Sequence, residues 1–288
     1  MLSEAKSNYL SRIRLQKYLF LLSKTSEVPQ ACSFYDFIPY KYGPYSFLAH
    51  HEINRMLRDG IIEADTRGYR LRQGAINRIA GELDSYIKTE ASTILRKYTR
   101  LSLNQLIDSV YGEFPWYAHR NEQRDVQKPV YQHFKKSIFT IGYENLSIDT
   151  FLNILLSGRI KAVIDVRRVP YSRKFGFSKQ ELFSKCKSVG IQYVGFPAFG
   201  IESNIRNSGR NRDEILRSYQ KDLSTISSSQ FNNIESLIKR KRAVLVCYEQ
   251  EPLMCHRYYL AQCLSSNLDY PIVHYNTGLS KWEKESNC

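Results

Sequence analysis

The second half of the chain alternates continuous apolar runs with segments of helical pattern. The runs KAVIDV (161–166) and RAVLVC (242–247) consist mainly of Val, Ile, Leu and Ala, whereas a half-exposed strand would alternate apolar and polar residues. Between such runs lie helical segments that end in glycine, SIDTFLNILLSG (147–158) and SKQELFSKCKSVG (178–190). We therefore predict an α/β domain over residues 137–288, with a mostly parallel sheet covered by helices on both faces.

The first half has a different pattern. Apolar residues recur at helical spacing in SRIRLQKYLFLLSK (11–24), and SFLAHHEINRMLRDG (46–60) is a second predicted helix with Ser46 as its N-cap. The segment IIEADTRGYRLR (61–72) is predicted to form a β-hairpin, the one short β element expected in this half. Helix, helix and basic hairpin is the order of a winged-helix module, so we predict a smaller, mainly α, winged-helix-like domain over residues 1–112.

Helical periodicity continues over residues 76–110. It is broken by a charged stretch that contains two prolines, residues 113–136, and we expect this stretch to be the linker between the domains.

The net charge of +14 and the pI near 9.4 indicate a polyanionic partner. Each half of the chain, divided after residue 137, holds 21 Lys+Arg and 14 Asp+Glu, so both halves are expected to contact it. We expect nucleic acid, DNA in preference to RNA. In the predicted wing, Arg67, Arg70 and Arg72 are candidate contacts to phosphate or to the minor groove.

The N-terminal segment shows no signal-peptide pattern, and no apolar run approaches the roughly 20 residues that span a bilayer. We expect a cytoplasmic protein with no membrane partner. The six cysteines are irregularly spaced, which favours reduced thiols over a disulfide framework. We expect no cofactor and no metal, and a homodimer is one assembly that the sequence allows.

Unusual polar residues follow the predicted strands, and the ends of parallel strands meet at one edge of a sheet. Motifs with fixed order occur there. They are Thr140-Ile141-Gly142 with Asn145; Asp165-Val166-Arg167 with Pro170 and Ser172; Gly176-Phe177; and Cys247, Glu249, Pro252 and Cys255-His256-Arg257. In these motifs residues 138–275 resemble a bacterial family known as domain of unknown function 488. Tyr143 stands where the family's first motif often has His, and Glu144 where it commonly has a small residue. The resemblance implies the α/β fold and no particular reaction.

Cys255-His256-Arg257 is expected to open a helix, where the dipole favours an anion and lowers the pKa of a thiol. Asp165 and Glu249 could divide general acid and base roles. Alternatively, each carboxylate could neutralise a buried arginine, Asp165 with Arg257 and Glu249 with Arg167.

Three kinds of site are compatible with these residues. A metal site through Cys247, Cys255 and His256 is disfavoured, because a second CxxC or HxxxH pair is missing and adjacent Cys255 and His256 side chains are expected to point apart. A cysteine nucleophile is the second, although Cys247 fits a small core residue. The sequence favours the third, an anion pocket in which Arg167 and Arg257 hold a phosphate and the carboxylates do acid/base work.

Three sets of residues are candidates for function. Catalytic candidates are Asp165, Glu249, Cys255 and His256. Candidates for binding the anion or substrate are Gly142, Tyr143, Asn145, Arg167, Ser172, Phe177 and Arg257. Candidates for binding nucleic acid, besides the wing, are Arg168, Arg173 and Lys174. Aromatic residues in the same loops could stack on bases, although four of the following seven are expected to pack inside the protein: Tyr143, Tyr171, Phe175, Phe177, Tyr193, Phe196 and Phe199.

The predicted function is therefore a nucleic-acid-binding protein whose α/β domain is a hydrolase that acts on a base or nucleotide of DNA, in repair or in defence against foreign DNA. One alternative is a DNA-binding regulator whose α/β domain senses a small anion without catalysis. Another is an adaptor that uses the N-terminal helices for protein contacts.

Overall fold

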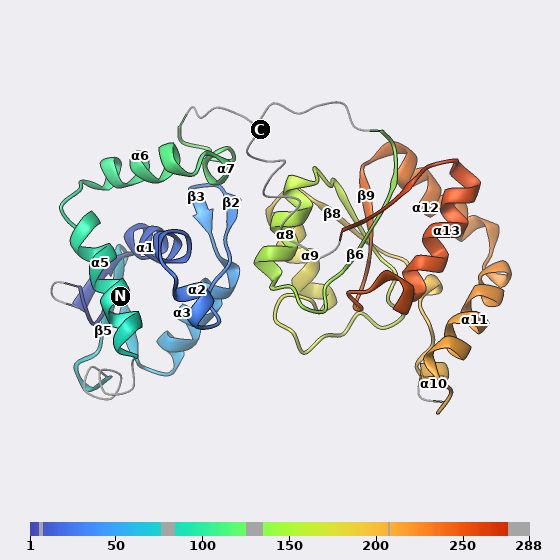
Figure 1. The fold of residues 1–288 in the computed structure, drawn as a ribbon, viewed down its shortest axis with the longest axis horizontal. Coiled ribbons are helices and arrows are strands. Elements are labelled where there is room, and N and C mark those ends of the chain that lie inside the picture. The colour runs from blue at the N-terminus through green and yellow to red at the C-terminus, as the bar shows by residue number, and fades with distance from the viewer. Residues whose placement is uncertain (6–7, 76–83, 125–134, 207, 276–288) are drawn as a thin grey trace. The chain divides into compact units, whose positions relative to one another are not determined.

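The computed structural model describes residues 1–5, 8–75, 84–124, 135–206 and 208–275. The chain divides into two compact units, Met1–Tyr131 and Gln132–Cys288 (Figure 1). None of the helices in the described ranges has the length and apolar character that a membrane crossing needs.

The first unit combines helices with short antiparallel strands. Its elements are β1 Tyr9–Ser11, α1 Arg12–Thr25, α2 Val28–Ala31, β2 Ile38–Tyr40, β3 Gly43–Tyr45, α3 Phe47–Arg58, β4 Ile62–Ala64, β5 Gly68–Leu71, α5 Ser85–Tyr98, α6 Leu103–Glu113 and α7 Pro115–Ala118. The strands form a three-stranded sheet in the order β1-β5-β4 and a separate β2-β3 hairpin. Helix α1 lies in the core, where Tyr18, Phe20 and Leu21 are completely buried.

Two local predictions for this unit are confirmed. The Ser46 side chain accepts a hydrogen bond from the Ala49 amide at 3.1 Å and so caps α3. Residues 62–71 form the expected hairpin from β4 and β5. The hairpin and the helices that precede it occur in winged-helix order, and assignment to that class remains a prediction.

Glycine is required at position 43. Its φ of +88° is a conformation that L side chains rarely adopt, and a Cβ atom there would lie 2.5 Å from both Lys17 Nζ and the Tyr111 ring. The Lys17 ammonium donates a hydrogen bond to the Tyr42 carbonyl at 2.8 Å. The close approach at Gly43 and the hydrogen bond from Lys17 therefore hold the Lys41–Gly43 segment against α1.

Three expectations for the first half were wrong in detail. Besides the β4–β5 hairpin, the unit contains β1 and the β2–β3 hairpin, because β1 pairs with β5 from a distant part of the sequence. The helix expected over residues 76–110 consists of α5 and α6, separated where Ser102 caps the second helix; residues 76–83 lie outside the described residues. The expected linker 113–136 is too long, since α7 lies within it and buries Tyr117 in the core of the first unit.

The second unit is an α/β domain with a five-stranded parallel sheet, as predicted. Its elements are β6 Ile138–Gly142, α8 Ile148–Ser157, β7 Ala162–Asp165, α9 Lys179–Ser188, β8 Gln192–Gly195, η2 Pro197–Phe199, α10 Ser203–Arg206, α11 Arg212–Asp222, η3 Leu223–Thr225, α12 Ser228–Arg240, β9 Ala243–Cys247, η4 Pro252–Met254, α13 His256–Leu268 and β10 Ile272–Tyr275. The strand order is β10-β6-β9-β7-β8, and each neighbouring pair is parallel.

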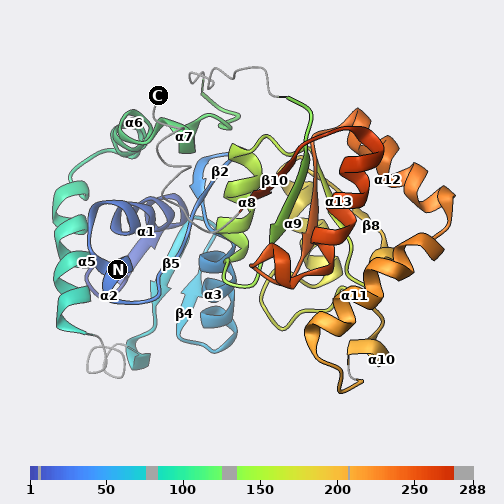
Figure 2. The same ribbon diagram turned by 45° about the vertical axis from the view of Figure 1, so that its right-hand side comes forward.

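Helices cover both faces of this sheet. Figures 1 and 2 show α8 and α9 on one face and α12 and α13 on the other. Strand side chains alternate between the faces. In β9, Ala243, Leu245 and Cys247 pack in the core formed with α11, α12 and α13, so Val244 and Val246 point towards α8 and α9. This alternation decides on which face each residue at a strand end lies.

Candidate functional site

Strands β6, β7, β8 and β9 all end at the same edge of the sheet, as the sequence predicted, because every pairing is parallel. The register aligns Asp165 of β7 with Val246 of β9. Cys247, one residue further along β9, therefore points to the opposite face from Asp165. The predicted site is consequently divided into two buried clusters, one on each face of the sheet.

The first cluster is built around Asp165 and Arg167 on the α9 face. Arg167 Nε and Nη2 donate to the two Asp165 carboxylate oxygens at 2.8 and 2.6 Å. Its Nη1 donates to the Tyr143 hydroxyl at 2.6 Å and to the Phe177 carbonyl at 2.9 Å. The Tyr193 hydroxyl donates to Asp165 at 2.7 Å, and its ring packs against Phe183 of α9. This network connects the ends of β6 and β7, the β8 residue Tyr193 and the loop after β7.

Arg167 is therefore a structural cation. Burial lowers the pKa of its guanidinium, but the hydrogen bond and the charge of Asp165 outweigh that effect and raise the pKa. The side chain is only 4% exposed and its donors are directed at protein acceptors. The structure does not bring Asp165 and Arg167 together with Cys255, so the anion pocket predicted between them is not formed.

The two terminal nitrogens of the Arg257 guanidinium also donate to protein acceptors. Arg257 is completely buried at the start of α13, where Nη1 donates to the Glu249 carbonyl and Nη2 donates to the Gln250 carbonyl at 2.9 Å. These bonds hold the loop that follows β9. Both pairings predicted for the carboxylates were wrong: Asp165 forms a buried ion pair with Arg167, not Arg257, and Glu249 pairs with the exposed Arg212, not with Arg167.

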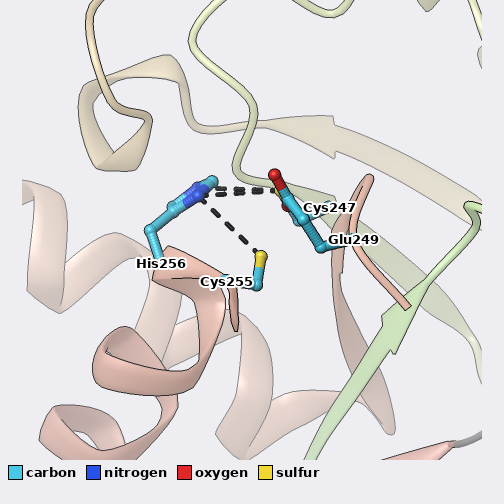
Figure 3. Close-up of side chains that lie close together, drawn as sticks. All are labelled: Cys247, Glu249, Cys255 and His256. Carbon is cyan, nitrogen blue, oxygen red and sulfur yellow. Dashed lines mark hydrogen bonds between the residues drawn. The ribbon is translucent and has the colours of Figure 1, made fainter. Parts of the chain in front are cut away.

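The second cluster lies on the α11–α13 face and contains Cys247, Glu249, Cys255 and His256 (Figure 3). The Cys247 thiol donates to Glu249 Oε2 at 3.2 Å and lies 3.6 Å from His256 Nδ1. The Cys255 sulfur lies 3.9 Å from the same nitrogen. The expectation that Cys255 and His256 point apart was wrong, because Cys255 has extended backbone angles and His256 is the first helical residue.

Helix α13 begins at His256, as predicted, but the predicted effect on the neighbouring thiol was wrong. Burial, followed by the hydrogen bond with Cys247, raises the pKa of Cys255 well above its ordinary value. The helix terminus does not compensate for the loss of water around a completely buried sulfur. Cys255 is thus a protonated thiol near neutral pH and a poor nucleophile by itself.

Glu249 is the member of the second cluster that reaches solvent, with 19% of its side chain exposed. Burial raises the pKa of its carboxyl group, but hydrogen bonds from Cys255, Cys247 and Arg212 outweigh burial and lower the pKa to about 2. Arg212, from the first turn of α11, contacts Glu249 Oε1 at 2.6 Å. Glu249 is therefore an ionised carboxylate whose two oxygens face different partners.

Gly142 is needed for the close packing of this edge. A Cβ atom at this position would lie 1.7 Å from the Glu249 carbonyl oxygen, so only glycine allows the loop after β9 to cross the end of β6. Gly142, predicted to bind an anion or substrate, thus positions the backbone of Glu249.

Other predicted binding residues also contact protein. Tyr143 stacks on the completely buried Phe177 with ring centroids 4.2 Å apart. Asn145 donates to the Gln250 side chain, and Ser172 accepts from the Lys174 amide at 3.1 Å. The Lys174 ammonium donates to the Tyr143 and Glu144 carbonyls. These residues fix the loops after β6 and β7.

The solvent side of the edge is formed by residues of the loops after β7 and β9. Tyr171 is 71% exposed, and Arg168 and Arg173 near it are also exposed. Tyr248 is 45% exposed and was not singled out in the sequence, although its position directly after β9 was a usable signal. As expected, four of the seven predicted stacking aromatics are buried: Tyr143, Phe177, Phe196 and Phe199.

A pocket of about 240 Å³ lies beside the second cluster. Arg168, Gly200, Ile215 and Tyr219 are among the residues that line it. The Tyr219 ring meets the His256 ring edge-on with centroids 5.2 Å apart, and this tyrosine was also not predicted. Tyr219 thus contacts both the pocket and the second cluster.

The wing residues of the first unit are exposed, as a role in binding requires. Arg67, Arg70 and Arg72 lie on the β4–β5 hairpin or directly beside it. Arg70 and Arg72 lie 3.8 and 4.0 Å from the exposed Glu63, distances at which ion pairing contributes little.

The comparisons with known proteins agree with the motifs at the sheet edge. Residues 147–264 match the family described as Domain of unknown function DUF488. The DUF488 match covers less than half of the chain. It includes Asp165, Arg167 and the segment from Cys247 to Arg257, and it begins after the Gly142 motif. No curated protein and no solved structure matches the chain.

Proposed function

We propose that the protein binds nucleic acid, DNA in preference to RNA, and that its α/β domain is a hydrolase acting on a base or nucleotide. The observation that carries this proposal is a surface of exposed apolar side chains at the carboxyl edge of the sheet. Nine large hydrophobic side chains are exposed in the described part of the chain, and five of them lie in the two loops after β7 and β9. The five are Val169, Tyr171, Tyr248, Leu253 and Met254.

This surface has the composition that single-stranded or flipped bases require. Strands β7 and β9 are neighbours, so the loops that follow them leave the sheet side by side. Tyr171 and Tyr248 offer aromatic faces, and Arg168 and Arg173, which lie within three residues of Tyr171 in the sequence, are exposed. Stacking a base on an aromatic side chain contributes about 1–3 kcal/mol, and arginines neutralise the neighbouring phosphates.

The second cluster supplies reactive groups at the same edge of the sheet. Glu249 follows Tyr248 directly, is ionised and reaches solvent. A carboxylate in this position can orient and polarise a water molecule in a hydrolytic step. The adjacent pocket, with Arg168 in its lining, gives a bound nucleotide a place close to His256.

The first unit supports the choice of DNA. Its exposed hairpin arginines and the preceding helices have the order of a winged-helix module, in which a helix enters the major groove and the wing contacts phosphates. The net charge of +14 favours the same partner.

The proposal is tested with the full chain and fluorescein-labelled single-stranded DNA, duplex DNA and RNA of the same sequence, in anisotropy titrations at increasing salt. We expect the logarithm of the binding constant to fall linearly with the logarithm of the salt concentration. Single-stranded or duplex DNA should be bound more tightly than RNA. Absence of binding to all three nucleic acids at low salt would refute the proposal.

Hydrolysis is tested separately. DNA incubated with the protein is analysed for strand scission and, by mass spectrometry, for released bases. We expect Glu249→Gln to abolish product formation while DNA affinity is retained, and the control variant Asp269→Asn, which changes an exposed carboxylate at the far end of α13, to keep both. DNA binding without product from any substrate would favour a non-catalytic DNA-binding regulator instead.

A further inference from the structure

We infer that Cys247, Glu249, Cys255 and His256 bind a single zinc ion. Their ligand atoms, two sulfurs, one nitrogen and one carboxylate oxygen, all lie within 4.8 Å of one another (Figure 3). Zinc is the divalent ion that takes thiolate, imidazole and carboxylate ligands together in a tetrahedron. The inference is independent of nucleic-acid binding.

Three of the six separations between the ligand atoms are close to those of such a tetrahedron, and none exceeds 4.8 Å. Atoms bound to zinc at about 2.0–2.3 Å at the corners of a tetrahedron lie roughly 3.3–3.8 Å from one another. Cys247 Sγ lies 3.2 Å from Glu249 Oε2 and 3.6 Å from His256 Nδ1, and Cys255 Sγ lies 3.9 Å from that nitrogen. An ion could therefore be bound with only small side-chain movements.

The fold supplies three of the four ligands from the end of β9 and the start of α13. Cys247 is the last residue of β9 and points inward by strand alternation. Cys255 is the N-cap of α13 with extended backbone angles, and His256 begins the helix, so a change of backbone conformation directs two adjacent side chains to one point. Glu249 lies on the loop between these elements, where the close approach of Gly142 positions its backbone.

The imidazole of His256 is held in the tautomer that a metal needs. Its Nε2 lies 3.1 Å from the Val166 carbonyl oxygen. A carbonyl oxygen can only accept a hydrogen bond, so Nε2 carries the proton and Nδ1 presents its lone pair to the two sulfurs. A hydrogen bond from the second ring nitrogen to a backbone carbonyl is the usual outer support of a zinc-bound histidine.

Charge is balanced around the site as well. Two thiolates, one carboxylate and Zn²⁺ carry a net charge of about −1. Arg212 Nη2 contacts Glu249 Oε1 at 2.6 Å, while Oε2 faces Cys247. One carboxylate oxygen is thus available to the ion, and the other is bound to a cation that neutralises the site.

Glu249 is also the ligand that could leave the metal. The other three residues are buried, whereas Glu249 is partly exposed at the carboxyl edge. Zinc with one exchangeable position acts as a Lewis acid that activates water, which is the chemistry a hydrolase uses.

Cobalt provides the test, because Co²⁺ substitutes for zinc and its absorption reports thiolate ligands. The full chain is reduced, stripped of metal with a chelator and titrated with Co²⁺ in the absence of nucleic acid. We expect one Co²⁺ per chain with thiolate-to-metal charge-transfer absorption, and its loss on addition of one equivalent of Zn²⁺.

Variants identify the ligands. Cys247→Ser and Cys255→Ser are expected to reduce the charge-transfer absorption by about half each, because one of two thiolates is removed. Cys263→Ser, a half-buried cysteine of the same helix α13 outside the cluster, should leave it unchanged. Glu249→Gln should keep the thiolate absorption and alter the ligand-field bands, and circular dichroism shows whether each variant is folded.

The inference is overturned if the reduced wild-type protein takes up no Co²⁺ with thiolate absorption. It is also overturned if folded Cys247→Ser and Cys255→Ser proteins give the wild-type spectrum, or if Cys263→Ser reduces the absorption as much as they do. Because no DNA is present, this failure is distinguishable from a failure of nucleic-acid binding.

Discussion

Arg167 donates hydrogen bonds to both carboxylate oxygens of Asp165, at 2.8 and 2.6 Å, inside the protein. The pair is completed by Tyr143, Tyr193 and the Phe177 carbonyl. An Asp-Val-Arg sequence at a strand end suggests catalysis, but here it holds the loop after β7 in place. The cluster of Cys247, Glu249, Cys255 and His256 lies on the other face of the sheet.

This assignment predicts that Asp165→Asn mainly destabilises the protein. It leaves the Arg167 charge buried without its counter-ion, which costs about 3–5 kcal/mol. Glu202→Gln removes the partner of the exposed Arg168 and should cost less than about 1 kcal/mol. Urea unfolding followed by circular dichroism measures the free energy of unfolding of both variants. Equal stability of the Asp165→Asn and wild-type proteins would show that the Asp165–Arg167 pair does not stabilise the fold.

Gly142 is expected to tolerate no side chain. In Gly142→Ala the Cβ atom would collide with the Glu249 carbonyl oxygen, so the loop after β9 must shift and the free energy of unfolding should fall by at least about 2 kcal/mol. The control is Gly112→Ala in helix α6, where a Cβ atom meets nothing within 4 Å. That variant should be up to about 1 kcal/mol more stable, because alanine favours the helix. A thermal unfolding comparison in which both substitutions behave alike would contradict the close approach.

The buried Lys17 side chain should make the free energy of unfolding depend on pH. This side chain is 1% exposed, and burial, followed by repulsion from Arg124, lowers the pKa of its ammonium group to about 7. The unfolded state, with an ordinary lysine pKa near 10.5, binds more protons between these values, so this residue makes stability rise as pH increases from about 7 to 10. Below pH 7 both states are protonated and the full burial penalty remains.

The measurement is the free energy of unfolding of the wild-type and Lys17→Met proteins from pH 6 to pH 10. The difference between the two proteins should shrink or change sign as pH rises, because only the wild type gains from deprotonation at position 17. A difference independent of pH would mean that the buried ammonium is not perturbed. The matched control Lys24→Met, at the exposed end of α1, should show no such trend.

The hairpin arginines are expected to contact phosphates. Replacing Arg67, Arg70 and Arg72 together by alanine should weaken duplex DNA binding at least about tenfold at low salt. It should also reduce the magnitude of the double-logarithmic salt slope by about 2–3, because each phosphate contact contributes about 0.9. Three exposed cations of the same unit, Arg96, Lys97 and Arg100, form the control triple. Equal losses in the two triple variants would indicate non-specific attraction by net charge.

Much of the fold followed from local patterns. Continuous Val and Ile runs predicted the parallel sheet, and Ser46 predicted the start of α3, because both depend on neighbours in the sequence. The pairing of β1 with β5 could not be predicted, because the local sequence of each short strand carries no signal for a partner almost 60 residues away.

The candidate site was predicted at the correct edge but not with the correct partners. Strand register decides that Asp165 lies opposite Val246, and therefore that Asp165 and Cys247 point to different faces. A single sequence does not reveal register between strands from distant segments. The pairing of Arg212 with Glu249 likewise depends on how α11 packs over the sheet, and the raised pKa of Cys255 depends on burial that exceeds the effect of the helix terminus.

The most direct test of the proposed nucleic-acid-binding surface is the affinity of the full chain for labelled single-stranded DNA after replacement of the exposed tyrosines at the sheet edge. Tyr171→Ala and Tyr248→Ala should each weaken binding by roughly tenfold, because a stacking contact contributes about 1–3 kcal/mol. Tyr86→Ala, an exposed tyrosine of helix α5 in the first unit, should bind like the wild type. Unchanged affinity in both edge variants, or an equal loss in Tyr86→Ala, would contradict the assignment of the carboxyl edge as the nucleic-acid-binding surface.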